Sequence, residues 1–149
     1  MRYYRVPQMV GQWVGYYILG PEYGLINVGE KVEFRFFIEQ NIDGQFSGTS
    51  VDYDGYGANF ETARIQGFID GDLISINKEY KDHLIIDEVG HTFIDNNSPK
   101  PKIHYTGTYN FNTKRFEGMF EVICNDIPFG DGYLVEVLTG NWEAWKDIS

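Results

Sequence analysis

The feature that most constrains this chain is the alternation of apolar and polar residues, combined with a near absence of helical periodicity. In the segment 31–40, Val32, Phe34, Phe36 and Ile38 occupy every second position. A period of two places these side chains on one face of a β-strand. No stretch keeps apolar residues at positions i, i+3, i+4 and i+7 for more than two turns. The chain is therefore predicted to be all-β.

Several further segments share this alternation or a β-rich composition. Asp43-Gly44 and Asp70-Gly71 separate neighbouring segments, and Asp-Gly favours the tight turns of β-hairpins. A looser turn is expected at 110–113, and the segment 83–94 is either a ninth strand or an irregular hairpin. Consecutive hairpins predict an antiparallel meander of about eight strands. Besides 31–40, the expected strands are 10–18, 45–53, 60–70, 72–80, 102–110, 114–124 and 133–145.

The two ends of the chain carry similar Gly-x-Trp patterns, Gly11-Gln12-Trp13 and Gly140-Asn141-Trp142. Closing a meander on itself removes its two unpaired edges, and pairing the first strand with the last would do this. We predict a single domain over residues 1–149, an up-and-down β-barrel, with a β-sandwich as the alternative. Small and large residues alternate on one face of both end strands, as a curved inner wall requires: Gly11, Trp13, Gly15 and Tyr17, then Leu138, Gly140, Trp142 and Ala144.

The length, the meander and the early Gly11-x-Trp13 resemble the calycin superfamily of lipocalins, fatty-acid-binding proteins and avidins. Lipocalins commonly set an arginine of the last strand against that tryptophan and add a helix. Here the last predicted strand carries Lys146, and the layout is closer to that of avidins, which lack the helix. The resemblance implies a barrel that encloses a small ligand. The biotin-contacting residues of avidins do not map onto this sequence, so biotin is not predicted.

The charge balance excludes some classes of partner. The chain has 12 basic and 22 acidic residues, a formal charge of −10. Such a surface repels phosphate backbones and anionic lipid, so we expect neither nucleic-acid nor membrane binding. The start of the chain lacks the apolar core of a signal peptide, and the single cysteine, Cys124, cannot form an internal disulfide. We therefore expect a cytoplasmic protein.

The best candidate for a polar site lies on the hairpin 60–80. A two-residue loop at Asp70-Gly71 would place Lys78 opposite Ala63 and Tyr80 opposite Glu61 on the inward face. Lys78, Tyr80 and Glu61 would then form a cluster inside one end of the barrel, where buried charges need partners. The alternative is a strand end that has already reached solvent.

The register of the preceding hairpin is less certain. A two-residue loop at Asp43-Gly44 pairs Arg35 with Asp52 on the outside and leaves Phe46 outside as well. A β-bulge would reverse the facing of Phe46.

Aromatic residues on the predicted inner faces form the rest of the candidate site. They would either line a ligand or fill the barrel, since small eight-stranded barrels do one or the other. The many tyrosines favour a pocket, because a buried phenol needs a hydrogen-bond partner. The candidate ligand-binding residues of this set are Trp13, Tyr17, Phe36, Tyr105, Phe120 and Trp142.

The sequence does not match the motifs of metal sites, nucleotide-binding sites or common hydrolases. His83, His91 and His104 lack the spacing of metal ligands, and the acidic segment 52–63 has Ala63 where a calcium loop requires a bidentate carboxylate. Cys124 in its β-rich run is expected to be a small buried residue. No nucleotide-binding or hydrolase motif is present. We therefore expect neither a metal nor a cofactor.

Three hypotheses for function remain. The first is a protein that binds a small, partly apolar ligand inside the barrel, with Lys78, Tyr80 and Glu61 at its polar end. The second is an enzyme on the same scaffold, of the isomerase or hydratase type. The third is a packed barrel that serves as a protein-interaction module. The long connections 19–30, 81–101 and 125–132 are expected at the mouth of the barrel. Tyr23 and 127–129 are apolar enough to cap an opening, although a protein contact or packing beneath a loop also fits, and packing is favoured.

Overall fold

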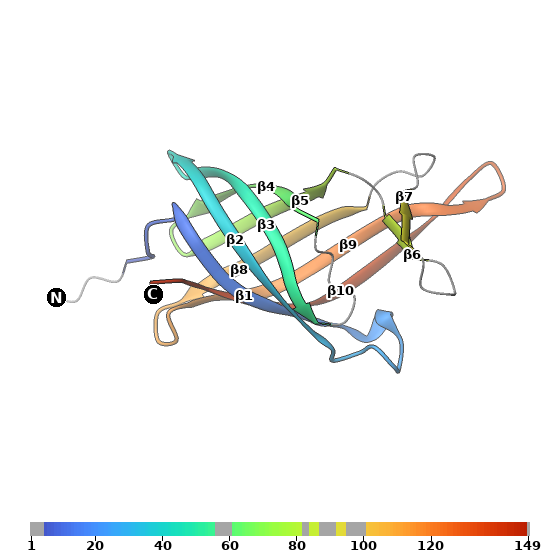
Figure 1. The fold of residues 1–149 in the computed structure, drawn as a ribbon, viewed down its shortest axis with the longest axis horizontal. Helices are drawn as coiled ribbons and strands as arrows, with labels where there is room; N and C mark the ends of the chain where they lie inside the picture. Colours follow the sequence, from blue (N-terminus) through green and yellow to red (C-terminus); the bar gives the residue numbers. More distant parts are fainter. Residues whose placement is uncertain (1–4, 56–60, 82–83, 87–91, 95–100, 149) are drawn as a thin grey trace.

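Eight strands of the described chain form a closed antiparallel barrel in the order β1-β10-β9-β8-β5-β4-β3-β2 (Figure 1). The structure is a computed structural model that describes residues 5–55, 61–81, 84–86, 92–94 and 101–148. The closed order confirms the predicted up-and-down barrel, and the sandwich alternative is wrong. The barrel strands are β1 (Gly11–Leu19), β2 (Lys31–Ile42), β3 (Gln45–Gly55), β4 (Ala63–Asp70), β5 (Leu73–Tyr80), β8 (Lys102–Asn110), β9 (Arg115–Phe129) and β10 (Gly132–Lys146).

The barrel closes where the first strand meets the last. β1 pairs with β10 over seven residue pairs, from Trp13 opposite Lys146 to Leu19 opposite Gly140. The other edge of β1 pairs with β2. Both edges of the meander are thus used within the chain, which is the arrangement that the two Gly-x-Trp patterns predict.

The hairpin β4–β5 differs from the predicted register by two residues. Asp70 pairs with Leu73, so the two-residue loop is Gly71-Asp72 rather than Asp70-Gly71. Gly71 at the first loop position has a φ of 61°, a conformation that glycine adopts without strain. Tyr80 therefore lies opposite Ala63 and not Glu61. Because the shift is an even number of residues, the inward face is unchanged.

The hairpin β2–β3 has the predicted Asp43-Gly44 loop, and both of its residues have positive φ angles, 52° and 87°. The register shifts between Ile38 and Gln40, so Glu39 is an extra residue in β2. This bulge turns Phe46 inward, where it is 3% exposed. The predicted pairing of Arg35 with Asp52 is wrong, because the shift brings Val51 opposite Arg35.

The remaining connections also depart in part from expectation. Within the segment 83–94, β6 (Leu84–Ile86) pairs antiparallel with β7 (Thr92–Ile94) in a separate two-stranded sheet, which agrees with the hairpin alternative and not with a ninth barrel strand. Residues 125–129 belong to β9 and extend the β9–β10 hairpin, so they are not a loop. The β1–β2 connection includes a short 3-10 helix, η1 (Pro21–Tyr23). No helix among the described residues has the length and apolarity needed to cross a bilayer.

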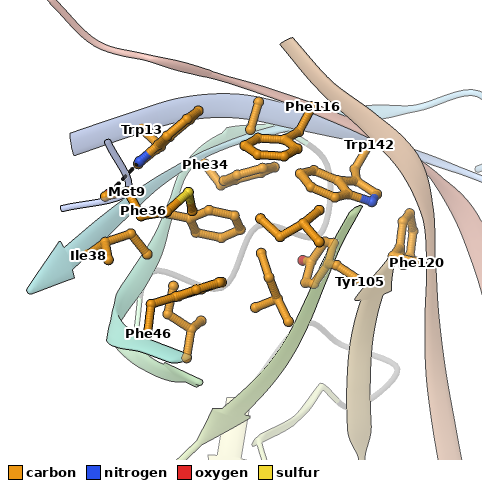
Figure 2. Packing of buried hydrophobic residues seen from close by; sticks show 14 of the residues in the cluster. Met9, Trp13, Phe34, Phe36, Ile38, Phe46, Tyr105, Phe116, Phe120 and Trp142 are labelled. Carbon is orange, nitrogen blue, oxygen red and sulfur yellow. Dashed lines mark hydrogen bonds between the residues drawn. The ribbon is translucent and has the colours of Figure 1, made fainter. Parts of the chain in front are cut away.

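The two ends of the barrel differ (Figure 1). Three tight turns, the start of β1 and the end of β10 lie at one end, which we call the closed end. Its interior is filled by the side chains of Met9, Trp13, Phe36, Phe46 and Phe116 (Figure 2). Only about 10 Å³ of space remains among them. The closed end therefore has no room for a ligand.

The opposite end, which we call the open end, carries the longer connections β1–β2, β3–β4 and β5–β8. Interior residues toward this end are more polar, and they include Ser50, Asp52 and Lys78. These three are the buried polar or charged residues of the described chain. The interior thus divides into an apolar half and a polar half.

Candidate functional site

The polar half of the interior is built around an ion pair between β3 and β5. Lys78 Nζ lies 3.5 Å from Asp52 Oδ1, and the two side chains are 3% and 1% exposed. Lys78 faces inward because it shares the period-two face of Ile74 and Ile76. Asp52 faces inward because the bulge at Glu39 sets the register of β3. The two opposite charges compensate each other at a position that is buried from water.

Three tyrosine rings surround the ammonium group of Lys78. Its Nζ lies 4.9 Å from the ring centroid of Tyr80, 5.8 Å from that of Tyr17 and 6.0 Å from that of Tyr105. The hydroxyl of Tyr17 donates a hydrogen bond of 2.9 Å to Asp52 Oδ2. Tyr17 lies on β1 and Tyr105 on β8, so four strands converge on the pair. Ring faces that point at a cation stabilise it when water is excluded.

Burial dominates the electrostatics of this cluster. It lowers the pKa of Lys78, and the carboxylate of Asp52 opposes that shift. Burial, and after it the charge of Asp52, raises the pKa of Tyr17, Tyr80 and Tyr105. The phenols are therefore neutral hydrogen-bond donors at physiological pH, and Lys78 is easier to deprotonate than an exposed lysine.

Ser50 is a buried residue of the polar half whose hydroxyl lacks a hydrogen-bond partner among the described residues. It lies on the inward face of β3, two residues before Asp52, and is fully buried. Its Oγ has no hydrogen-bond partner among the described residues. A buried hydroxyl with no partner costs about 1–3 kcal/mol, so such a group calls for an explanation.

The other predicted polar residue, Glu61, precedes β4 and is half-buried. Its charge contributes to the raised pKa of Tyr80, so the two side chains are close enough to interact. The structure thus brings Lys78, Tyr80 and Glu61 into one region, although by a register that differs from the predicted one.

The predicted aromatic residues separate into two groups. The ring centroid of Phe120 lies 5.2 Å from that of Tyr17 and 5.9 Å from that of Tyr105, so Phe120 belongs to the polar half. Phe36 and Trp142 contact Tyr105 from the closed-end side, at 6.0 and 5.5 Å. Phe36 and Trp142 therefore separate the Lys78–Asp52 cluster from the apolar packing of the closed end.

Trp13 lies deeper and is not brought to the cluster. Its ring packs against Phe116 at 5.4 Å, and its Nε1 donates to the carbonyl of Met9 at 2.8 Å (Figure 2). It belongs to the packing of the closed end.

Sequence reasoning missed the importance of Asp52 and Ser50. It placed Asp52 on the outside for a hairpin without a bulge, left open the bulge that reverses this facing, and did not single out Ser50. The signal that could have found them is the alternation Phe46, Gly48, Ser50, Asp52, in which a large apolar residue identifies the inward face.

His104 lies apart from this cluster. His104 points outward from β8, with its Nδ1 2.6 Å from Asn77 Oδ1 and its Nε2 3.2 Å from Ser75 Oγ. His83 and His91 lie outside the described residues. Cys124 is half-buried rather than fully buried. Within the described ranges, no group of three or more potential metal ligands comes together.

This chain is similar to known proteins in its fold and not in its sequence. No protein-family model and no curated protein sequence matches the chain. A rhizavidin–biotin complex has 12% identity and a TM-score of 0.49, covering 96% of this chain and 100% of that one. Apo shwanavidin has 11% identity and a TM-score of 0.45, covering 91% and 97%. A structure of EF1p2_mFAP2b bound to DFHBI has 10% identity and a TM-score of 0.49, covering 91% and 92%. The strand order itself confirms the predicted closed up-and-down barrel, and these structures are similar to it in fold.

Proposed function

We propose that this protein binds a small, partly apolar molecule in the polar half of its barrel. The observation that carries the proposal is the buried hydroxyl of Ser50, which has no hydrogen-bond partner among the described residues and lies two residues before Asp52 on the same inward face of β3. A ligand that hydrogen-bonds to Ser50 would remove the cost of burying this hydroxyl alone.

The polar group of the ligand would meet Ser50, Lys78, Tyr80 and Glu61. Its apolar part would pack against the rings of Tyr17, Tyr105 and Phe120, whose edges and faces suit a flat molecule. Phe36 and Trp142 would support this surface from below. Trp13 would act at a distance, by keeping the closed end packed.

Charge favours an uncharged polar group on the ligand. Asp52 already compensates the ammonium of Lys78 at 3.5 Å. A carboxylate drawn to Lys78 would approach Asp52 as well, and two like charges in a low-dielectric interior repel strongly. A hydroxyl or carbonyl group can hydrogen-bond to Ser50 and Tyr80 without this penalty.

The test compares cuminyl alcohol with cuminate, which share an apolar aromatic body and differ in the polar group. Binding to the purified protein is followed by two-dimensional amide NMR. We expect cuminyl alcohol to shift amides of β1, β3, β5 and β8 toward the open end and to bind about tenfold more tightly than cuminate. Native mass spectrometry of freshly purified protein checks in parallel for a co-purified small molecule.

The matched variants are Ser50→Ala and Ser47→Ala. Ser50→Ala removes a buried hydroxyl with no structural partner, so the free energy of unfolding should stay the same or rise while affinity for cuminyl alcohol falls by up to about tenfold. Ser47 lies on the outer face of the same strand, and its replacement should leave affinity unchanged. If neither compound shifts the interior amides and no adduct co-purifies, the proposal is wrong.

A further inference from the structure

Lys78 is the interior lysine of the described chain, and its surroundings differ from those of a lysine that serves only as a charge. Its side chain is 3% exposed, whereas Lys81, Lys102 and Lys114 are exposed. One carboxylate oxygen lies 3.5 Å from its nitrogen, and the other oxygen of that carboxylate accepts the hydroxyl of Tyr17.

An amine, a carboxylate and a phenol held together in a dry site are the groups needed for carbonyl condensation. The amine is the nucleophile, and the carboxylate can take up a proton and return it. We propose that Lys78 forms a reversible imine with an aldehyde bound in the polar half of the barrel. This inference rests on the proposed function, since the aldehyde must first occupy the ligand site.

The reaction conserves atoms and charge. The ammonium of Lys78 gives a proton to Asp52, and the free electron pair on Nζ attacks the aldehyde carbon. The carbonyl oxygen takes up a proton from the nitrogen, which leaves a neutral carbinolamine. Asp52 returns its proton to the carbinolamine hydroxyl, the carbon–oxygen bond breaks, and water leaves. The product is a protonated imine paired with the Asp52 carboxylate, and no oxidant or reductant takes part.

Neighbouring groups would assist both stages. The Oγ of Ser50, two residues from Asp52 on the same face, would hydrogen-bond to the carbonyl oxygen or to the carbinolamine hydroxyl. Tyr17 orients the carboxylate through its 2.9 Å hydrogen bond. The rings of Tyr17, Tyr80 and Tyr105 face the position of the iminium charge as they now face the ammonium.

The ionisation of Lys78 supports this role. Burial lowers the pKa of its amine, although Asp52 opposes the shift. The reactive, unprotonated fraction of an amine rises about tenfold for each unit by which its pKa falls. Lysines with perturbed pKa values are those that form Schiff bases in proteins.

The experiment incubates the full chain with cuminaldehyde and sodium cyanoborohydride, which reduces an imine to a stable secondary amine. Peptide mapping by mass spectrometry then gives the modified fraction of each lysine. We expect Lys78 to be modified about tenfold faster than the exposed Lys102 and Lys114 of the same molecule. Because the comparison is internal to the unmodified sequence, it does not depend on whether a variant folds.

Two variants complete the test. Lys78→Arg keeps a cation beside Asp52 but cannot form an imine, so the fast phase of labelling should disappear. Lys102→Arg is the matched control and should retain that phase. Excess cuminyl alcohol should slow the labelling of Lys78 by competition and leave the exposed lysines unaffected.

The outcomes separate the two proposals. If cuminyl alcohol binds in the interior but Lys78 is labelled no faster than Lys102, the imine is overturned and the proposed function stands. If neither cuminyl alcohol nor cuminaldehyde reaches the interior, the proposed function fails and the imine fails with it.

Discussion

Lys146 places its ammonium over the indole ring of Trp13, with Nζ 5.4 Å from the ring centroid. The same nitrogen donates to the carbonyl of Gln8 at 2.5 Å and to the carbonyl of Val10. Trp13 in turn donates from Nε1 to the carbonyl of Met9. The last residue of β10 thus fixes the segment before β1 across the closed end.

Replacing Lys146 by methionine should destabilise the fold. The variant keeps the apolar stem but removes the cation and two hydrogen bonds from a charged donor, so we expect a loss of about 2–3 kcal/mol in the free energy of unfolding. Urea denaturation followed by tryptophan fluorescence measures this loss. Lys102→Met, at an exposed position of β8, is the control and should change stability by less than about 0.5 kcal/mol. Equal effects of the two substitutions would contradict the assigned role of Lys146.

The Lys78–Asp52 pair should behave as a coupled unit. Removing one partner leaves the other charge buried without compensation, so Lys78→Met and Asp52→Asn should each cost about 3–5 kcal/mol. The double variant should cost clearly less than the sum of the single losses, because it removes both charges together. A double-mutant cycle by chemical denaturation gives the coupling energy. Additive losses would show that the two groups do not interact.

Stability should fall at alkaline pH because the buried tyrosines resist ionisation. Burial raises the pKa of Tyr23 to about 12, and it raises the pKa of Tyr17, Tyr80 and Tyr105 as well. An acid whose pKa is higher in the folded state than in the unfolded state stabilises the fold below the unfolded value, about 10 for tyrosine. That contribution is lost as the pH rises above about 10. Lys78, with its lowered pKa, acts in the opposite direction, but it is one group against four.

Urea denaturation at a series of pH values from neutral to strongly alkaline checks this expectation. Absorbance of the phenolate ion, recorded on the same samples, should show part of the tyrosines ionising only as the protein unfolds. A fold that keeps its full stability beyond the normal titration range of tyrosine would disagree with the burial of these phenols.

Glycine on the inner wall should be required where strands approach closely. A Cβ at Gly140 would lie 2.1 Å from the carbonyl oxygen of Ile18 and 2.3 Å from a ring carbon of Phe120. Gly140→Ala should therefore cost at least about 1–3 kcal/mol. Gly132 begins the same strand and has no atom of the described residues within 4 Å of the corresponding position, so Gly132→Ala is a matched control expected to be nearly neutral. Thermal unfolding of the two variants checks the difference.

The facing of most side chains could be predicted from the sequence, because alternation records it directly. The inward positions of Phe34, Ile76 and Trp142 required no knowledge of the register. The β4–β5 register could not be predicted with the same success. An Asp70-Gly71 loop and a Gly71-Asp72 loop give pairing registers that differ by two residues. Both registers leave the same residues inside, so the apolar pattern does not distinguish them.

The chemistry of the site was harder to predict. Asp52 is inward because Glu39 is an extra residue in the partner strand, and a bulge has no strong local signature in the sequence. Lys78 was found because it shares a strand face with two isoleucines. Its partner was missed because that partner lies on β3, which β4 separates from β5 in the sheet.

The bulge at Glu39 has a consequence for how such a barrel can diversify. A single inserted residue decides which of two interleaved sets of β3 side chains, Phe46 to Asp52 or Gln45 to Val51, lines the interior. Loss of that residue would exchange one set for the other along much of the strand without altering any β3 codon. An insertion or deletion at one site is therefore a route by which relatives with this architecture could acquire new binding preferences in one step, where point substitutions would need several.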